Sequence, residues 1–128
     1  MVNDYVPYMY VQDGITYYEV CDGTYILNAN ENGELVSCEP LNTITKEFDL
    51  LIPAKVGEYK ITSIRDGAFS NTNLRRYIRK IIVADDTVET VPAHVFENLP
   101  KLKEVVLGDS VTYIGDSAFA NSDELKGL

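Results

Sequence analysis

The sequence has few of the residues and motifs from which catalytic and metal sites are usually built. Its 128 residues include one histidine, His94, and two cysteines, Cys21 and Cys38. It has no glycine-rich phosphate loop, no C-x-x-C pair and no serine–histidine–aspartate set that a repeat would bring together. We therefore expect a protein that is not an enzyme and that needs no cofactor.

Positive charge and long apolar segments are also scarce. The chain has 11 basic and 20 acidic residues, a net charge of −9. Such a chain repels phosphate backbones and anionic membrane surfaces, which argues against nucleic acid as a partner. No apolar run approaches the roughly 20 residues of a transmembrane helix, so we expect no membrane insertion. The N-terminus, Met1 to Tyr5, lacks the basic start and apolar stretch of a secretion signal, so a secreted protein would be present here as a mature form or a fragment.

The second half of the chain contains an internal repeat. Three stretches share one pattern: apolar, two residues, apolar, three residues, small apolar, Phe, one residue, Asn. The stretches span 61–71, 88–98 and 111–121. Their phenylalanines, Phe69, Phe96 and Phe119, are 27 and 23 residues apart. A period in this range is typical of a solenoid, in which each unit buries its apolar face against its neighbour.

A strand pattern lies between the repeats. Leu102 to Leu107 reads L-x-x-V-x-L, and Ile78 to Val83 has the same pattern. Alternation along the strand predicts that Val105 and Leu107 point inward and that Val106 points outward. The predicted repeat core consists of Ile64, Phe69, Val91, Phe96, Leu102, Val105, Leu107, Ile114 and Phe119, with the phenylalanines stacked as a spine.

Two polar positions recur in the repeats. Asn71, Asn98 and Asn121 follow each phenylalanine by two residues, and we expect them to bond to the backbone of the turns and to stack as a ladder. His94 aligns with a glycine and a serine of the other repeats, which predicts a spacer that faces solvent. No acid–base pair is evident near it in the sequence.

These repeats resemble the BspA-type leucine-rich repeat family over residues 59–128, and Phe48 to Pro53 resembles the strand that leads into the first repeat. The resemblance implies an α/β leucine-rich repeat solenoid, mostly β with short helical turns. Residues 54–128 then hold about two and a half repeats, the last without its strand. Proteins with such repeats are typically surface-exposed or secreted and are associated with adhesion to host or matrix proteins, so the resemblance implies an extracellular or cell-surface location.

The first half, residues 1–53, is predicted to be an N-terminal β-meander that caps the repeats. Residues 8–38 alternate with period two, and Asp13-Gly14, Asp22-Gly23 and Asn32-Gly33 each favour a tight hairpin turn. Two-residue turns place Val20 opposite Tyr25 and Ala29 opposite Val36, with Leu27 opposite Cys38; around the first turn, Met9 lies opposite Tyr18 and Val11 opposite Thr16.

The same register separates the two cysteines. Cys21 lies on the polar face and Cys38 on the apolar face, two strands away, so we predict that their thiols do not bridge. A disulfide is the alternative if the chain is extracellular.

One segment mimics a calcium loop. Asn28, Asn30, Asn32 and Glu39 occupy oxygen-ligand positions of an EF-hand pattern. An asparagine at the first position supplies no negative charge, and the flanks are predicted strands. A hairpin turn at Asn32 explains the same residues, so we expect no metal.

The candidate binding residues lie on the strand face. Leu51, Ile82 and Val106 form an outward apolar row, and Arg79, Lys80, Lys103 and Glu104 lie beside it. The alternative is that the bases neutralise acids such as Glu104 and that the row reflects β-propensity or is covered by a loop.

The leading hypothesis is a non-catalytic interaction module whose strand face binds a protein or a glycan. The alternative is a structural unit or fragment of a longer repeat protein that self-associates through its open C-terminal end.

Overall fold

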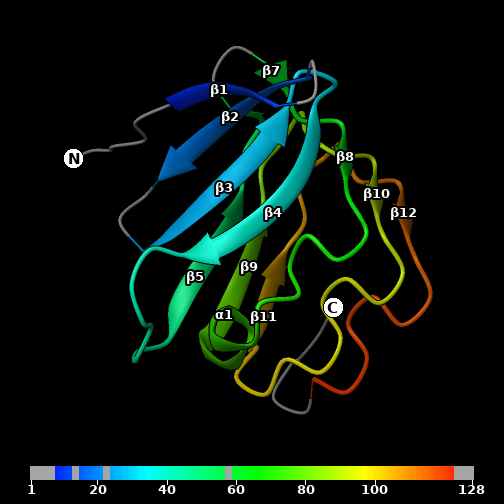
Figure 1. Ribbon diagram of the computed structural model, residues 1–128. Coiled ribbons are helices and arrows are strands. Elements are labelled where there is room, and N and C mark those ends of the chain that lie inside the picture. The colour runs from blue at the N-terminus through cyan, green and yellow to red at the C-terminus, as the bar shows by residue number, and fades with distance from the viewer. Residues whose placement is uncertain (1–7, 13–14, 22–23, 57–58, 123–128) are drawn as a thin grey trace.

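The chain folds mostly into strands, with one short helix in the part described (Figure 1). The structure is a computed structural model that describes residues 8–12, 15–21, 24–56 and 59–122, and for 8–12 and 15–21 it describes the backbone alone. The predicted end of the last repeat, at Leu125 to Leu128, lies outside these residues.

The first half forms the predicted four-stranded antiparallel meander. Its strands are β1 (Tyr8–Gln12), β2 (Ile15–Cys21), β3 (Tyr25–Asn30) and β4 (Glu34–Pro40). β1 and β2 pair in the predicted register, with Met9 opposite Tyr18 and Val11 opposite Thr16. The predicted turns at Asp13-Gly14 and Asp22-Gly23 fall outside the described residues.

The register between β2 and β3 differs from the prediction. Val20 lies opposite Leu27, whereas a two-residue turn would place it opposite Tyr25. The connection between the paired residues Cys21 and Ile26 is therefore longer than a two-residue turn allows. Because the shift is two residues and the side-chain period of a strand is also two, the shift leaves the assignment of residues to faces unchanged.

A β-bulge makes the register between β3 and β4 differ from the prediction. Leu27 lies opposite Cys38 as predicted, but Ala29 lies opposite Leu35, not Val36, because the register shifts after Asn28. The bulge turns Leu35 into the core, where it is fully buried, and leaves Val36 only half-buried.

The strands that precede the repeats form a parallel sheet in the order β11-β9-β5. They are β5 (Phe48–Ile52), β9 (Ile78–Val83) and β11 (Glu104–Val106). The predicted boundary at residue 53 assigns β5 to the N-terminal region, while its hydrogen-bonded neighbour is the repeat strand β9.

Shorter strands lie at the start of each repeat. β8 (Ser63–Ile64) pairs in parallel with β4 and so joins the meander to the first repeat. β10 (Thr90–Val91) pairs in parallel with β12 (Tyr113–Ile114), and β6 (Lys55–Val56) pairs with β7 (Tyr59–Lys60).

One backbone conformation recurs in the turn of every repeat. Gly67, His94 and Ser117 occupy the same repeat position and have φ angles of +83°, +62° and +58°. A left-handed residue is uncommon outside glycine, so its return at one position supports the alignment of the three repeats. The imidazole of His94 is 60 % exposed, in agreement with the predicted solvent-facing spacer.

The recurring asparagines have two different roles. Asn71 caps α1 (Thr72–Tyr77), because its side-chain oxygen accepts a hydrogen bond from the N–H of Leu74 at 2.9 Å. Asn98 and Asn121 instead adopt left-handed backbone conformations, each with a φ of +59°. The predicted bond to turn backbone is thus present at Asn71, whereas the described residues that follow Asn98 form no helix for it to cap.

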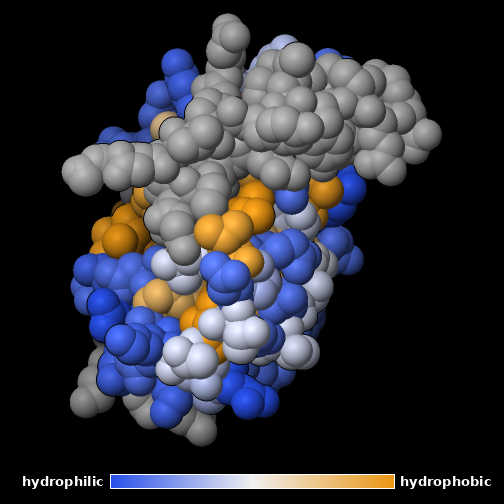
Figure 2. Space-filling view, turned by 60° about the vertical axis from the view of Figure 1, so that its left-hand side comes forward, coloured by the Kyte–Doolittle hydropathy of each residue, from blue (hydrophilic) through white to orange (hydrophobic). Residues whose placement is uncertain are grey.

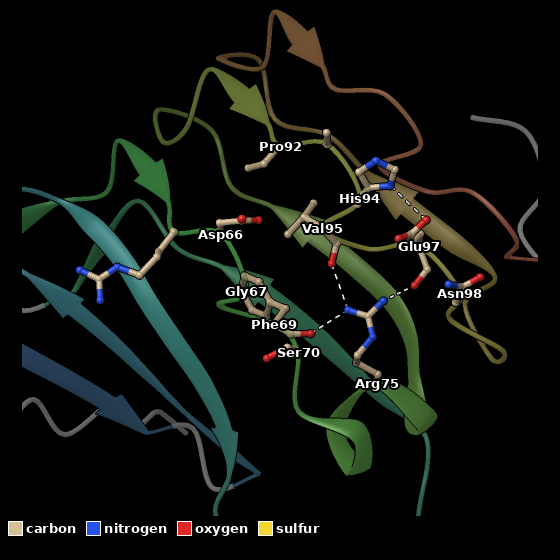
Figure 3. Close-up of a pocket in the computed structure, with 12 residues that line it drawn as sticks. Asp66, Gly67, Phe69, Ser70, Arg75, Pro92, His94, Val95, Glu97 and Asn98 are labelled. Carbon is tan, nitrogen blue, oxygen red and sulfur yellow. Dashed lines mark hydrogen bonds and ion pairs between the residues drawn. The ribbon is translucent and has the colours of Figure 1, made fainter.

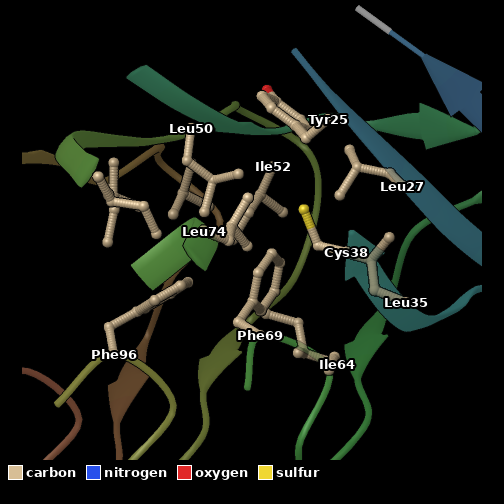
Figure 4. Close-up of a cluster of buried hydrophobic side chains, with 14 of the residues drawn as sticks. Tyr25, Leu27, Leu35, Cys38, Leu50, Ile52, Ile64, Phe69, Leu74 and Phe96 are labelled. Atoms are coloured by element: carbon tan, nitrogen blue, oxygen red, sulfur yellow. The ribbon is translucent and has the colours of Figure 1, made fainter. Parts of the chain in front are cut away.

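The core joins the meander to the repeats, as Figure 4 shows for Tyr25, Leu35, Cys38 and Phe69. The predicted phenylalanine spine is present: ring centroids are 5.1 Å apart for Phe69 and Phe96 and 5.8 Å apart for Phe96 and Phe119. The buried members of the predicted repeat core are Ile64, Phe69, Val91, Phe96 and Leu102.

The predicted core from Val105 onward is less buried than expected. Val105, Leu107 and Phe119 are partly buried against the core, and Ile114 is 40 % exposed. Ile114 was predicted to lie in the core, but its strand, β12, is the outer strand of a two-stranded sheet and pairs only with β10 among the described residues. A solvent-facing edge leaves its apolar side chains without a covering layer.

Candidate binding surface

The outward apolar row has the predicted alignment. Leu51 lies opposite Ile82, and Ile82 lies opposite Val106, so one residue of each strand in the parallel sheet contributes to the row. Leu51 and Ile82 are half-buried, and Val106 is 40 % exposed. The neighbouring residues Leu50 and Ile81 point the other way and are fully buried.

A charged row runs beside the apolar row, two residues earlier in each strand. Asp49, Lys80 and Glu104 lie in register across the sheet. Arg79 falls at a register shift between β5 and β9, and its Nε lies 2.8 Å from a carboxylate oxygen of Asp49. An extra residue in the strand thus brings two cations, Arg79 and Lys80, to the same face.

The bases of this face are paired with acids, as the alternative interpretation expects. Nζ of Lys80 lies 3.6 Å from Glu104, and Nζ of Lys103 lies 3.6 Å from Glu47. These groups are largely exposed, so the pairs contribute little to stability. Asp49, Arg79, Lys80, Lys103 and Glu104 also line a shallow cavity of about 290 Å³. The face therefore carries weak ion pairs, whose partners a ligand could replace, next to apolar side chains.

Figure 2 shows one face of the molecule, on which hydrophobic side chains reach the surface in separate islands among hydrophilic ones. The large hydrophobic residues of the described part that are most exposed are Leu41, Val106, Tyr113 and Ile114. Three of these four belong to β11 and β12, so the exposed large hydrophobic residues of the described part are concentrated on its last two strands.

Arg75 has a role that the sequence reasoning missed. Its Nη1 donates hydrogen bonds to the carbonyl oxygens of Phe69 at 2.7 Å and Val95 at 3.1 Å, and its Nη2 donates to that of Glu97. Burial lowers the pKa of the Arg75 guanidinium, and the charge of Glu97 opposes this effect. From its place in α1, four residues after the cap Asn71, Arg75 joins the turns of two repeats.

The only histidine has an acidic neighbour. Nδ1 of His94 lies 3.2 Å from a carboxylate oxygen of Glu97, three residues later in the chain. The expectation that no acid–base pair lies near His94 is therefore wrong, since Glu97 is such a partner. The two side chains come together because the left-handed turn at His94 folds the chain back on itself.

The calcium-like segment forms a hairpin. The buried Asn30 accepts hydrogen bonds through Oδ1 from the N–H groups of Asn32 and Glu34, while the amide of Asn28 donates to Ser37 across the strands. Glu39 lies further along β4 and accepts from Asn71. The four oxygen-bearing residues are thus spread along a strand ladder, as the hairpin interpretation predicts.

The two cysteines lie on strands that β3 separates. Cys21 pairs with Ile26 and Cys38 pairs with Leu27 on the two sides of β3. Cys38 is fully buried, and the side chain of Cys21 is outside the described residues. The absence of a bridge between them stays a prediction.

In the part of the chain that the structure describes, no helix combines the length and the apolar character needed to cross a membrane. The helix found there, α1, has six residues.

The fold and the repeats define a leucine-rich repeat protein: parallel strands, recurring left-handed turns and a spine of adjacent phenylalanine rings. A family model described as the BspA type leucine rich repeat region (6 copies) matches residues 62–128, just over half of the chain. The chain belongs to this BspA-type leucine-rich repeat family. No curated protein and no solved structure matches the chain. Repeats of this family are typically non-catalytic modules that bind proteins.

Proposed function

We propose that this protein is a non-catalytic adhesion module that binds a protein ligand through the outward face of β5, β9 and β11. The repeats would stack as a solenoid in which this face is the recognition surface, with residues 1–53 as its N-terminal cap. The observation that carries the proposal is the aligned row of Leu51, Ile82 and Val106. An in-register apolar row on an exposed strand face is typical of an interaction surface.

The charged row supports the same proposal. The acids and bases beside the apolar row are already paired, so a ligand that binds here exchanges one partner for another and leaves no charge unpaired. Interfaces commonly combine an apolar centre with a polar rim of this kind. Leu51, Ile82 and Val106 would form the centre, and Arg79, Lys80, Lys103 and Glu104 would form the rim.

Binding to immobilised collagen, laminin and fibrinogen, with serum albumin as a control surface, tests the proposal. Val106→Glu and Ile82→Glu are expected to weaken binding of a positive hit at least tenfold, since each places a charge in the apolar row. Tyr113→Glu is the matched control, because Tyr113 is 59 % exposed on a different sheet. Equal binding by all variants, or binding to a glycan array in place of the proteins, would contradict the proposal.

The family also supports a location at the cell surface or outside the cell. Protease treatment of intact source cells, with peptides followed by mass spectrometry, tests this. Release of peptides from unbroken cells is the expected result. Protection until lysis would place the protein inside the cell.

A second candidate function is self-association as a structural unit. It is supported by the exposed Tyr113 and Ile114 on β12, the outer strand of its sheet in the described part. Tyr113→Glu should then abolish a concentration-dependent increase in solution mass, while Val106→Glu should leave most of it. The two candidate functions therefore respond to opposite variants.

A further inference from the structure

The hydrogen bonds between consecutive repeat turns are regular at one junction and missing at another. Between the second and third repeats, the N–H groups of His94, Phe96 and Asn98 donate to carbonyl oxygens of the third repeat at 3.0, 2.9 and 2.7 Å. In the opposite direction, the N–H of Gly115 donates to the carbonyl of Val91 at 2.7 Å. This ladder holds the two turns at strand spacing.

The equivalent ladder is absent between the first and second repeats in the part of the chain described. β8 pairs with β4, and β10 pairs with β12, but β8 and β10 are not paired with each other. No backbone hydrogen bond joins residues 61–71 to residues 88–98. The junction is held by Arg75 and by the packed, mutually tilted rings of Phe69 and Phe96.

Pro92 explains the break. It occupies the position of Arg65 in the first repeat and Gly115 in the third, and both of those residues donate a backbone hydrogen bond to the preceding layer, at 2.8 and 2.7 Å. Proline has no N–H to donate. The position is also crowded: a Cβ added at Gly115 would lie 2.4 Å from the backbone nitrogen of Ala93. Pro92 thus carries a ring where the next repeat has a glycine in close backbone contact with the preceding turn.

Arg75 replaces part of the missing ladder. Val95 and Glu97 are the counterparts of Ala118 and Ala120, whose carbonyl oxygens accept from backbone N–H groups at the next junction. At this junction the guanidinium of Arg75 donates to the carbonyls of Val95 and Glu97 instead (Figure 3). Gly67 and Ala93 form the one position at which neither group is replaced: the N–H of Gly67 and the carbonyl of Ala93 have no hydrogen bond with any described residue. The N–H groups of Phe69 and Asn71 likewise have no backbone acceptor among the described residues, although Arg75 binds the carbonyls opposite them.

A cavity of about 300 Å³ opens at this break, and both Gly67 and Ala93 line it. This volume is at the lower end of the range of about 300 to 1,000 Å³ that ligand pockets occupy. Its charged lining residues balance, with Arg65 and Arg75 against Asp66 and Glu97. A balanced lining favours an uncharged ligand group over a phosphate or a free cation.

We propose that this cavity binds an extended peptide segment of a partner protein by main-chain hydrogen bonding. Gly67 and Ala93 together offer one unpaired backbone donor and one unpaired backbone acceptor at the cavity, and a peptide unit supplies the complement of each. Its carbonyl accepts from Gly67, its N–H donates to Ala93, and the half-buried apolar side chains of Pro92 and Val95 receive a neighbouring side chain of the ligand. Such strand addition is a common mode of peptide recognition. The site is separate from the strand face proposed above, and neither proposal depends on the other.

The test uses a random heptapeptide library displayed on phage, selected on the full chain and counter-selected on Pro92→Gly. The Pro92→Gly variant restores the missing N–H and the space that Gly115 has in the third repeat. Selected peptides are synthesised, and their dissociation constants are measured by fluorescence anisotropy. We expect at least tenfold weaker binding to Pro92→Gly and to Ser70→Trp, which fills the cavity from an exposed lining position. Ser70→Ala and Val106→Glu should bind as the wild type does.

Amide chemical shifts of the ¹⁵N-labelled chain locate the site. Titration with a selected peptide should move the N–H of Gly67 and slow its hydrogen exchange. The proposal is overturned if no peptide depends on the cavity, if peptides bind the Ser70→Trp variant unchanged, or if the Gly67 amide responds to monosaccharides and not to peptides. If Pro92→Gly does not fold, Ser70→Trp against Ser70→Ala decides the question.

Discussion

The phenolic oxygen of Tyr25 accepts a hydrogen bond from the backbone N–H of Leu51 at 2.9 Å. Leu51 lies in β5, an outer strand of the parallel sheet, and such a strand carries a row of backbone groups that no neighbouring strand pairs. Tyr25 is 1 % exposed, and its ring lies 5.7 Å from that of Phe48. A buried residue of the meander thus provides the hydrogen-bond acceptor for one backbone N–H on the unpaired edge of the repeat sheet.

Replacing Tyr25 with phenylalanine should destabilise the protein by about 1–2 kcal/mol, because the change keeps the ring but leaves the N–H of Leu51 without its acceptor. Urea unfolding followed by circular dichroism measures the effect. Tyr113→Phe is the control: Tyr113 is 59 % exposed, and its loss of a hydroxyl should change stability by less than about 0.5 kcal/mol. Equal urea midpoints for the two variants would show that the hydrogen bond from Leu51 to the Tyr25 hydroxyl does not stabilise the protein.

The bulge in the meander makes a prediction that separates two neighbouring residues. Leu35→Ala should destabilise the protein by about 2–5 kcal/mol, since Leu35 is fully buried and its truncation leaves a cavity. Val36→Ala should have a small effect, because Val36 is half-buried on the other side of the strand. Thermal unfolding of both variants checks this. A larger loss for Val36→Ala would support the register without a bulge.

The sequence predicted the repeats, the meander and the alignment of Leu51, Ile82 and Val106, because period-two alternation and repeat spacing are properties of side-chain order alone. It did not predict the registers around Val20 and Leu35. A register depends on turn length and on bulges, which arise from backbone hydrogen bonding across the sheet and leave no period in the sequence.

The candidate sites show the same division. The strand face follows from alternation, but the pairing of Arg79 with Asp49 and the span of Arg75 between two turns required three-dimensional contacts. The break at Pro92 did have a sequence signal. Proline stands where the other two repeats carry residues with an N–H, Arg65 and Gly115, and alignment of the repeats at this position could have revealed it.

An exposed ion pair between β7 and the loop that follows β9 gives a pH-dependent prediction. Nζ of Lys60 lies 2.7 Å from Oδ1 of Asp86, and the hydrogen bond and charge of Lys60 hold the pKa of Asp86 below its ordinary value. Because the pKa is lower in the folded state, the stabilisation is present above the unfolded pKa of Asp86 and is lost as pH falls through the folded one. Both side chains are largely exposed, so the effect on stability is small.

Carboxyl-carbon NMR titration measures this pKa directly. Lys60→Met should raise the pKa of Asp86 towards that of a free aspartate. Lys55→Met should raise the pKa of Asp86 less, because the charge of Lys55 makes the smallest contribution to lowering that pKa. An unchanged Asp86 titration in Lys60→Met would mean that the ion pair does not form in solution.

Arg75 gives the sharpest stability prediction, because two neighbouring arginines differ in their contacts. Arg75 is half-buried and donates to three carbonyl oxygens in two repeat turns, whereas Arg76 is exposed. Arg75→Met should destabilise the protein by roughly 2–3 kcal/mol, since it leaves those carbonyls without a donor, and Arg76→Met should change stability by less than about 0.5 kcal/mol. Arg75→Lys should recover only part of the loss, because a single ammonium cannot reproduce the planar fork of a guanidinium. Urea unfolding measures the stability of all three variants. If Arg75→Lys is as stable as the wild type, charge alone accounts for the effect, which would contradict a bridging role for the guanidinium.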